Sequence, residues 1–210
     1  MTDWIFVAAW ALLGAMSAYP AAGLVRTLDP AGSNSPVRQW QTIACTAAVF
    51  AVLAARLGLT STLLAYSTLT SIIIPITATD LREHRLPTRP IAWTAAAITL
   101  IFGIAAITTR RPDQLVQALI SAGVCLAMLT SAYLITPGFV GGGDIRLAGL
   151  LVLALGWTGW VTAIRGIVIG VGLGAAYGLY QLLRRRITRS AHVPLGPALA
   201  LGSLLSVLAV

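Results

Sequence analysis

Charge is scarce in this sequence of 210 residues, of which only 10% are Asp, Glu, Lys or Arg. A soluble domain carries about 25% charged residues, so this chain has too few to cover a water-facing surface. Hydrophobic residues make up 58% of the sequence, and its mean hydropathy is +0.88. These values exclude a soluble enzyme and a disordered chain. They predict a polytopic helical membrane protein.

Lysine is absent, and all 14 basic residues are arginine, against six acidic residues. In a soluble protein the resulting formal charge of +8 would suggest a nucleic-acid partner. In a membrane protein it is better explained by cytoplasmic loops that lie against anionic lipid. The sequence therefore predicts anionic phospholipid as a partner and no nucleic acid.

Cysteine and histidine are rare, with two residues of each. Cys45 and Cys125 lie far apart inside apolar segments, and we interpret them as buried free thiols. His84 and His192 fall in distant loops, and no H-E-x-x-H motif occurs. No G-x-S-x-G, P-loop or dinucleotide fingerprint is present either. The sequence therefore predicts neither a metal nor a cofactor.

Eight apolar segments approach the roughly 20 residues that a membrane-spanning helix needs. They cover about residues 4–25, 40–57, 62–79, 91–107, 115–136, 144–157, 160–183 and 195–210. The first lacks the basic start of a secretory signal, so we expect it to be a retained span. No soluble domain fits between the segments. The predicted fold is an all-α transmembrane bundle of about eight spans, forming one membrane domain over residues 1–210.

Arginine placement predicts the orientation, because cytoplasmic loops of membrane proteins carry an excess of basic residues. If the N-terminus lies outside, the outer loops hold only Arg56, Arg110 and Arg111. The cytoplasmic side then holds Arg26, Arg38, Arg82, Arg85, Arg89, Arg146, Arg184, Arg185, Arg186 and Arg189. Arg165 lies within the seventh segment, and we expect its long side chain to reach the outer interface.

Glycines recur every four residues in the seventh segment, at Gly166, Gly170, Gly174 and Gly178. This spacing places them on one helix face, where a second helix can approach closely. The pattern predicts tight helix packing and carries no chemistry.

Asp80 and Asp144 each lie where an apolar segment meets a cytoplasmic loop, and so at the same expected membrane depth. Ionisable groups at that depth are costly and usually functional. Taken singly, Asp144 could cap the helix that follows it, and Asp80 could be a loop acid paired with Arg82 or Arg85. Their occurrence together favours a joint chemical role.

Two carboxyl groups that share a proton can activate water for peptide hydrolysis. One carboxylate takes a proton from water, while the protonated partner donates a hydrogen bond to the scissile carbonyl oxygen. The field at a helix N-terminus favours the anion at Asp144, and the field at a C-terminus disfavours it at Asp80. We therefore expect Asp80 to carry the shared proton. Gly141, Gly142 and Gly143 would let an extended substrate backbone approach closely.

These residues resemble known motifs. Gly141-x-Gly143-Asp144 resembles the G-x-G-D signature of intramembrane aspartyl proteases. Asp80, followed after a short basic stretch by Leu86-Pro87, resembles the first motif of the type IV prepilin leader peptidases. Residues 144–147, Asp-Ile-Arg-Leu, resemble the second motif, in which lysine is commoner than arginine at the third place. Residues 193–202 are similar to that family's last segment, which contains proline and glycine.

The resemblance implies an aspartic endopeptidase that removes the short basic leader from type IV prepilin-like precursors. Cleavage would occur at the cytoplasmic face of the inner membrane, with Asp80 and Asp144 as the catalytic pair and residues 1–210 as a single peptidase domain. The residues that it implies for substrate binding are Gly141, Gly142, Gly143, Arg82, Arg85, Leu86, Pro87 and Arg146. We further expect Arg82, Arg85 or Arg89 to contact an acidic residue early in the mature pilin.

The larger bifunctional members of that family carry four zinc-binding cysteines in a cytoplasmic loop. In this chain, the loop 26–40 is short and contains no cysteine. The chain therefore resembles the short form without the cysteine-rich methylase loop, as in tight-adherence (Flp-type) pilus systems and archaeal preflagellin peptidases.

Two alternatives remain open at this point. Pro197-Ala198-Leu199 is similar to the P-A-L motif of presenilin- and signal-peptide-peptidase-like proteases, although Thr79, and not tyrosine, precedes Asp80. A small polytopic transporter or pilus-assembly scaffold could instead use the same acids as ligands, and glycine-rich broken helices suit that function. No inverted repeat is evident in the sequence.

Overall fold

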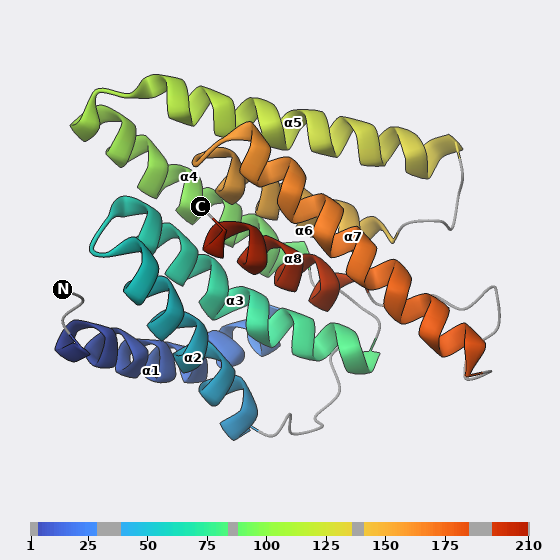
Figure 1. Cartoon of the computed structure of the whole chain (residues 1–210), viewed down its shortest axis with the longest axis horizontal. Helices are drawn as coiled ribbons and strands as arrows, with labels where there is room; N and C mark the ends of the chain where they lie inside the picture. The colour runs from blue at the N-terminus through green and yellow to red at the C-terminus, as the bar shows by residue number, and fades with distance from the viewer. Residues whose placement is uncertain (1–3, 29–38, 84–87, 136–140, 185–194, 210) are drawn as a thin grey trace. The chain divides into compact units, whose positions relative to one another are not determined.

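The computed structural model describes residues 4–28, 39–83, 88–135, 141–184 and 195–209. Within these ranges the regular structure is entirely helical, which confirms the predicted all-α class (Figure 1). The helices are α1 (Trp4–Leu28), α2 (Gln39–Leu57), α3 (Ser61–Glu83), α4 (Thr88–Thr109), α5 (Pro112–Ile135), α6 (Gly142–Gly156), α7 (Trp160–Leu183) and α8 (Gly196–Leu208).

Six of the described helices, namely α1 to α5 and α7, are long and apolar enough to cross a membrane. The remaining two are shorter, with 15 residues in α6 and 13 in α8. Both are shorter than the roughly 20 residues that a hydrocarbon core requires, so the crossing expected of these two helices stays a prediction. The chain is a multi-pass membrane protein.

Two compact units divide the chain, and each is described by itself. The first, Met1–Val116, contains α1 to α4 and the start of α5. The second, Gln117–Val210, contains the rest of α5 together with α6, α7 and α8. The single domain expected over residues 1–210 stays a prediction.

In the first unit, α1 packs along α2 (Figure 1). The two helices approach closely at Gly14, where a Cβ atom would lie 2.6 Å from Cγ of Phe50. Helices in lipid gain little from burying apolar surface against one another, because the acyl chains are equally apolar. A small residue at the crossing therefore stabilises the pair by letting the side chains of the partner pack against its backbone.

Hydrogen bonds join α1 to α3. The indole Nε1 of Trp10 donates to Oγ of Ser67 at 2.9 Å, and the hydroxyl oxygens of Ser17 and Ser71 lie 3.0 Å apart. Interhelical hydrogen bonds of this kind contribute on average about 0.6 kcal/mol each in membrane proteins. They fix the register of α3, the helix that carries Asp80.

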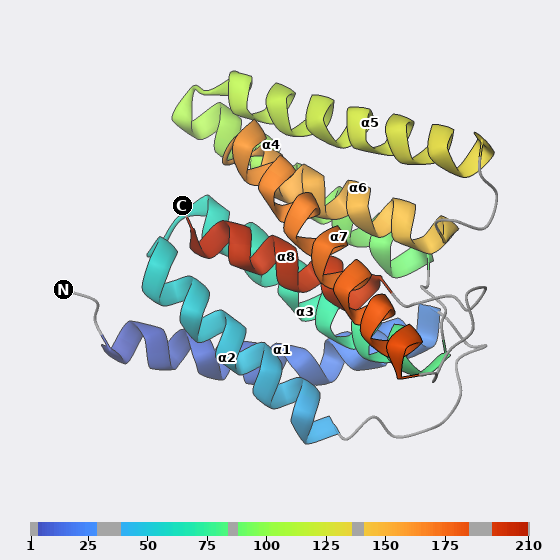
Figure 2. The ribbon, with the colours of Figure 1, turned by 45° about the vertical axis from the view of Figure 1, so that its right-hand side comes forward.

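In the second unit, α7 and α8 lie side by side in both views (Figures 1 and 2). Gly170 of α7 faces α8 so closely that a Cβ atom there would lie 2.8 Å from Cα of Leu199. Gly202 of α8 meets the backbone of Gly170 in return. The glycine face predicted for this helix is confirmed at its three buried positions, Gly166, Gly170 and Gly174.

The short helix α6 is buried on nearly every side, as expected for a helix whose sequence is apolar all round. It packs against α5 through its glycines: a Cβ atom on Gly149 would lie 2.6 Å from Leu126, and one on Gly156 would lie 3.0 Å from Ser121. Leu155 of α6 also contacts Gly166 of α7. These contacts hold the helix that begins near Asp144.

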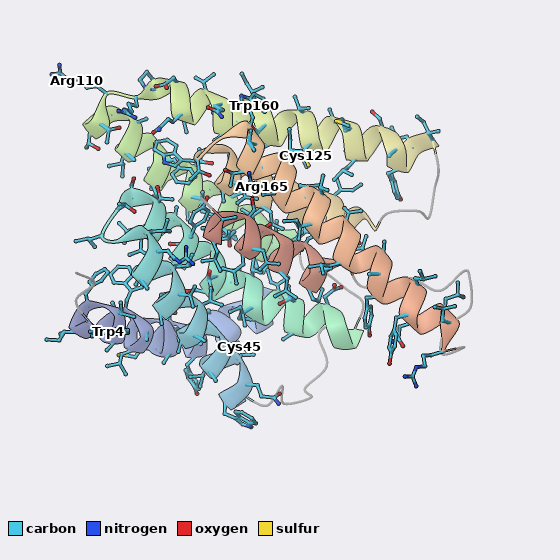
Figure 3. The ribbon with its side chains drawn as sticks, in the orientation of Figure 1. Trp4, Cys45, Arg110, Cys125, Trp160 and Arg165 are labelled. Atoms are coloured by element: carbon cyan, nitrogen blue, oxygen red, sulfur yellow. The ribbon has the colours of Figure 1, made fainter. Side chains whose placement is uncertain are left out.

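The outer faces of the long helices are apolar, as lipid contact requires: Ile107 and Leu134, for example, are 79% and 71% exposed. Figure 3 shows Cys45, Cys125 and Arg165 on these helices. Cys45 is exposed and Cys125 is partly exposed, so the prediction that both thiols are buried was wrong. The physical reason is that lipid accepts an apolar thiol as readily as a protein interior does. Arg165 is exposed on α7, and its reach to the outer interface stays a prediction.

Candidate active site

Asp80 lies in the last turn of α3, and its residue is only 4% exposed. The residues before it are buried at intervals of three and four, which trace one face of a helix. This buried stripe consists of Tyr66, Leu69, Ile73 and Ile76. Asp80 extends the stripe, so its carboxyl group belongs to the protein-facing side of a helix. The alternative that Asp80 is an ordinary loop acid was wrong.

Asp144 is the third residue of α6 and is 8% exposed. The N-cap is Gly141, whose carbonyl oxygen accepts the first helical hydrogen bond from the N–H of Ile145 at 3.2 Å. Asp144 is therefore not the N-cap residue, and the alternative that its side chain only satisfies free N–H groups of this helix stays open. An acid in the first turn still lies in the favourable field of the helix N-terminus, which stabilises a carboxylate.

The side chain of Asp144 turns back toward the start of its helix. A Cβ atom added to Gly141 would lie 2.9 Å from Oδ2 and 3.7 Å from Cγ of Asp144. Apart from its chain neighbours and the backbone of its own helix, no described atom lies within 4 Å of a Cβ atom added to Gly142. Of Gly141 and Gly142, it is therefore Gly141 that faces the carboxyl group.

Arg146 follows Asp144 by two residues and is exposed, whereas its neighbours Ile145 and Leu147 are buried. Arg89, in the first turn of α4, is also exposed. Among the other residues predicted to bind substrate, Arg82 lies in α3. Arg85, Leu86 and Pro87 lie outside the described residues.

The structure brings two of the predicted site residues together, Gly141 and Asp144. Asp80 belongs to the first unit and Asp144 to the second, so their pairing stays a prediction. Sequence analysis interpreted Gly141 as a substrate contact and missed its contact with the acid. The signal that could have found it is the spacing from N-cap to third helical residue, at which a side chain can reach back to the helix start.

No group of three or more His, Cys, Asp or Glu residues that could hold a metal ion occurs in the part of the chain that the structure describes. The described residues form a helical membrane protein with two buried carboxyl groups, each near one end of an apolar helix. This combination is typical of the class of membrane proteins that use buried acids at a functional site.

The sequence model of the type IV leader peptidase family matches residues 67–179, and the chain belongs to this family. The chain is also similar to the prepilin leader peptidase/N-methyltransferase of Bacillus subtilis (strain 168), with 30% identity over 163 residues. The similarity covers 78% of this chain and 62% of that protein, so the chain spans about three fifths of the length of this relative. No solved structure matches the chain.

Proposed function

We propose that this chain is an aspartic endopeptidase that removes the short basic leader from type IV prepilin-like precursors. The observation that carries the proposal is the position of Asp80 and Asp144. Both fall inside the segment 67–179 that matches the leader peptidase family, and each is a buried acid near the end of an apolar helix. A buried carboxyl group is costly in a membrane protein unless its chemistry is used.

In the proposed reaction, the carboxylate of Asp144 accepts a proton from water as the water attacks the scissile carbonyl carbon. Asp80, which carries the shared proton, donates a hydrogen bond to the carbonyl oxygen and stabilises the negative charge that develops there. The C–N bond then breaks as Asp144 passes the proton that it took from water to the nitrogen of the leaving amine. The first turn of α6 supports this assignment, because its dipole favours the anion at Asp144.

We further propose that the reaction takes place at the cytoplasmic face of the inner membrane, with the N-terminus of the chain outside. The arginine-rich side of the protein would then lie against anionic phospholipid. The substrate would be held by the glycines before Asp144 and by residues of the two motifs, namely Gly141, Gly142, Gly143, Arg82, Arg85, Leu86, Pro87 and Arg146. Arg89, which is exposed, would be available to an acidic residue of the precursor.

The direct test is cleavage by the purified full chain of a synthetic peptide with a basic leader, a glycine and an apolar helix. Asp80→Asn and Asp144→Asn are each expected to reduce cleavage by about 10⁴-fold or more, because catalytic groups that act together fail together. Asp113→Asn is the matched control, since Asp113 is an exposed acid in the first turn of α5. It is expected to cleave at the unaltered rate.

If both asparagine variants keep full cleavage, the aspartic mechanism is wrong. If the two variants keep full cleavage while transport fails, the transporter or scaffold alternative is correct.

A further inference from the structure

We propose that Gly141 is a positioning residue for Asp144: the absence of a side chain at position 141 leaves the space in which the reactive carboxylate lies. This inference goes beyond the substrate contact proposed for the glycine triplet. It rests on the proposed function for the catalytic role of Asp144, but the contact itself can be tested without substrate.

The backbone of Gly141 does not require glycine. Its φ of −71° and ψ of 139° describe an extended conformation that all residues adopt. A serine, threonine, asparagine or aspartate would also cap the helix better than alanine does, and at least as well as glycine. Neither conformation nor capping therefore explains a glycine at this position.

Space explains it. A Cβ atom at position 141 would lie 2.9 Å from Oδ2 of Asp144, closer than real Cβ atoms come to another heavy atom. Apart from the two chain neighbours of Gly141, the only described atoms within 4 Å of that Cβ position belong to the carboxyl group of Asp144. The substitution therefore displaces the carboxyl group and little else.

The displacement matters because Asp144 is buried and its side chain is short. The side chain has two rotatable bonds, so moving the carboxyl group away from position 141 re-aims both oxygens. A reacting group misplaced by about 1 Å can cost about 10²-fold in rate. Gly141 would thus act through Asp144, without touching the substrate.

The contact is tested by a double-mutant cycle on thermal unfolding of the full chain in detergent. Gly141→Ala is expected to lower the midpoint by about 2–4 °C in the unaltered chain. In the Asp144→Ala background most of this shift should disappear, because the carboxyl group that the methyl group meets has been removed. Gly142→Ala is the control, and its shift should be the same in both backgrounds, since a Cβ atom there meets nothing within 4 Å.

The role in the reaction is tested by steady-state cleavage of the same synthetic peptide. Gly141→Ala is expected to lower kcat by about 10- to 100-fold with KM changed less than about twofold. Gly141→Ser is the second variant, because serine keeps the Cβ atom while offering a good N-cap; it should lose kcat similarly and fold more stably than the alanine variant. Gly172→Ala, on the open face of α7, should cleave normally.

Equal midpoint shifts for Gly141→Ala in both backgrounds would overturn the contact, whatever the cleavage assay shows. A rise in KM with unchanged kcat in Gly141→Ala would overturn the positioning role and support the earlier interpretation of Gly141 as a substrate contact. Full kcat in Gly141→Ser would also overturn the positioning role. If Asp144→Asn keeps full cleavage, the proposed function fails and the positioning role fails with it, while the cycle still reports whether the two residues meet.

Discussion

The hydroxyl of Ser206 in α8 donates a 2.7 Å hydrogen bond to the backbone carbonyl oxygen of Thr162 in α7. Both residues are buried, and 44 positions separate them in the sequence. The bond lies on the same side of α7 as the glycines that bring the two helices together. It therefore links the end of α8 to the beginning of α7 in the unit that carries Asp144.

The contribution of this hydrogen bond to stability can be measured by removing the hydroxyl group. Ser206→Ala is expected to lower the free energy of unfolding by about 0.6 kcal/mol, the average for interhelical hydrogen bonds in membranes, and by at most about 1.7 kcal/mol. Ser203→Ala is the control, because its buried hydroxyl makes no hydrogen bond with the described residues, so its loss should be neutral or stabilising. Unfolding of the full chain in detergent measures both. Equal destabilisation by the two variants would contradict the account.

The glycines of α7 give a second prediction about packing. Gly170→Ala should destabilise the fold by about 1–3 kcal/mol, because the methyl group would meet the backbone of Leu199 in α8 and force the helices apart. Gly172→Ala, two residues away on the open face, should be neutral or stabilising, since alanine is the better helix former. Thermal unfolding of the two variants compares them, and a larger loss for Gly172→Ala would refute the packing argument.

The proposed orientation, with the N-terminus outside, predicts that cysteines introduced at two arginine positions react with a maleimide from opposite sides of the membrane. Arg110, at the end of α4, and Arg184, at the end of α7, are both exposed. In a chain whose Cys45 and Cys125 are replaced by alanine, Arg110→Cys should react with a membrane-impermeant maleimide in intact cells. Arg184→Cys should react only after the membrane is opened. The reverse pattern would place the N-terminus inside and contradict the proposed topology.

The sequence predicted the helices well because a span must satisfy its backbone hydrogen bonds internally and be apolar over its length. α7 begins and ends at the predicted residues, Trp160 and Leu183. The end of α3 was missed: the apolar run stops at Thr79, but the helix continues to Glu83. Hydropathy reports where lipid contact ends, whereas a helix can continue into polar surroundings.

Side-chain facing was harder to predict. Cys45 lies in α2, where lipid makes an apolar outer face as favourable as an apolar inner face, so hydropathy alone could not predict its exposure. Asp80 and Asp144 could be selected from the sequence as candidate site residues, because acids are rare in membrane-spanning segments. The contact between Gly141 and Asp144 was missed: the spacing from N-cap to third helical residue permits it, but only the structure shows that the side chain turns back.

The central claim is that the carboxyl groups of Asp80 and Asp144 meet. Disulfide formation between Asp80→Cys and Asp144→Cys, in the chain lacking its own cysteines, tests it directly, because a disulfide requires Cα atoms within about 7 Å. The positive control is Ser17→Cys with Ser71→Cys, whose native hydroxyl oxygens lie 3.0 Å apart. The account predicts an oxidised cross-link at both pairs when the precursor peptide is present. A control pair that cross-links while positions 80 and 144 never do, with or without peptide, would contradict it.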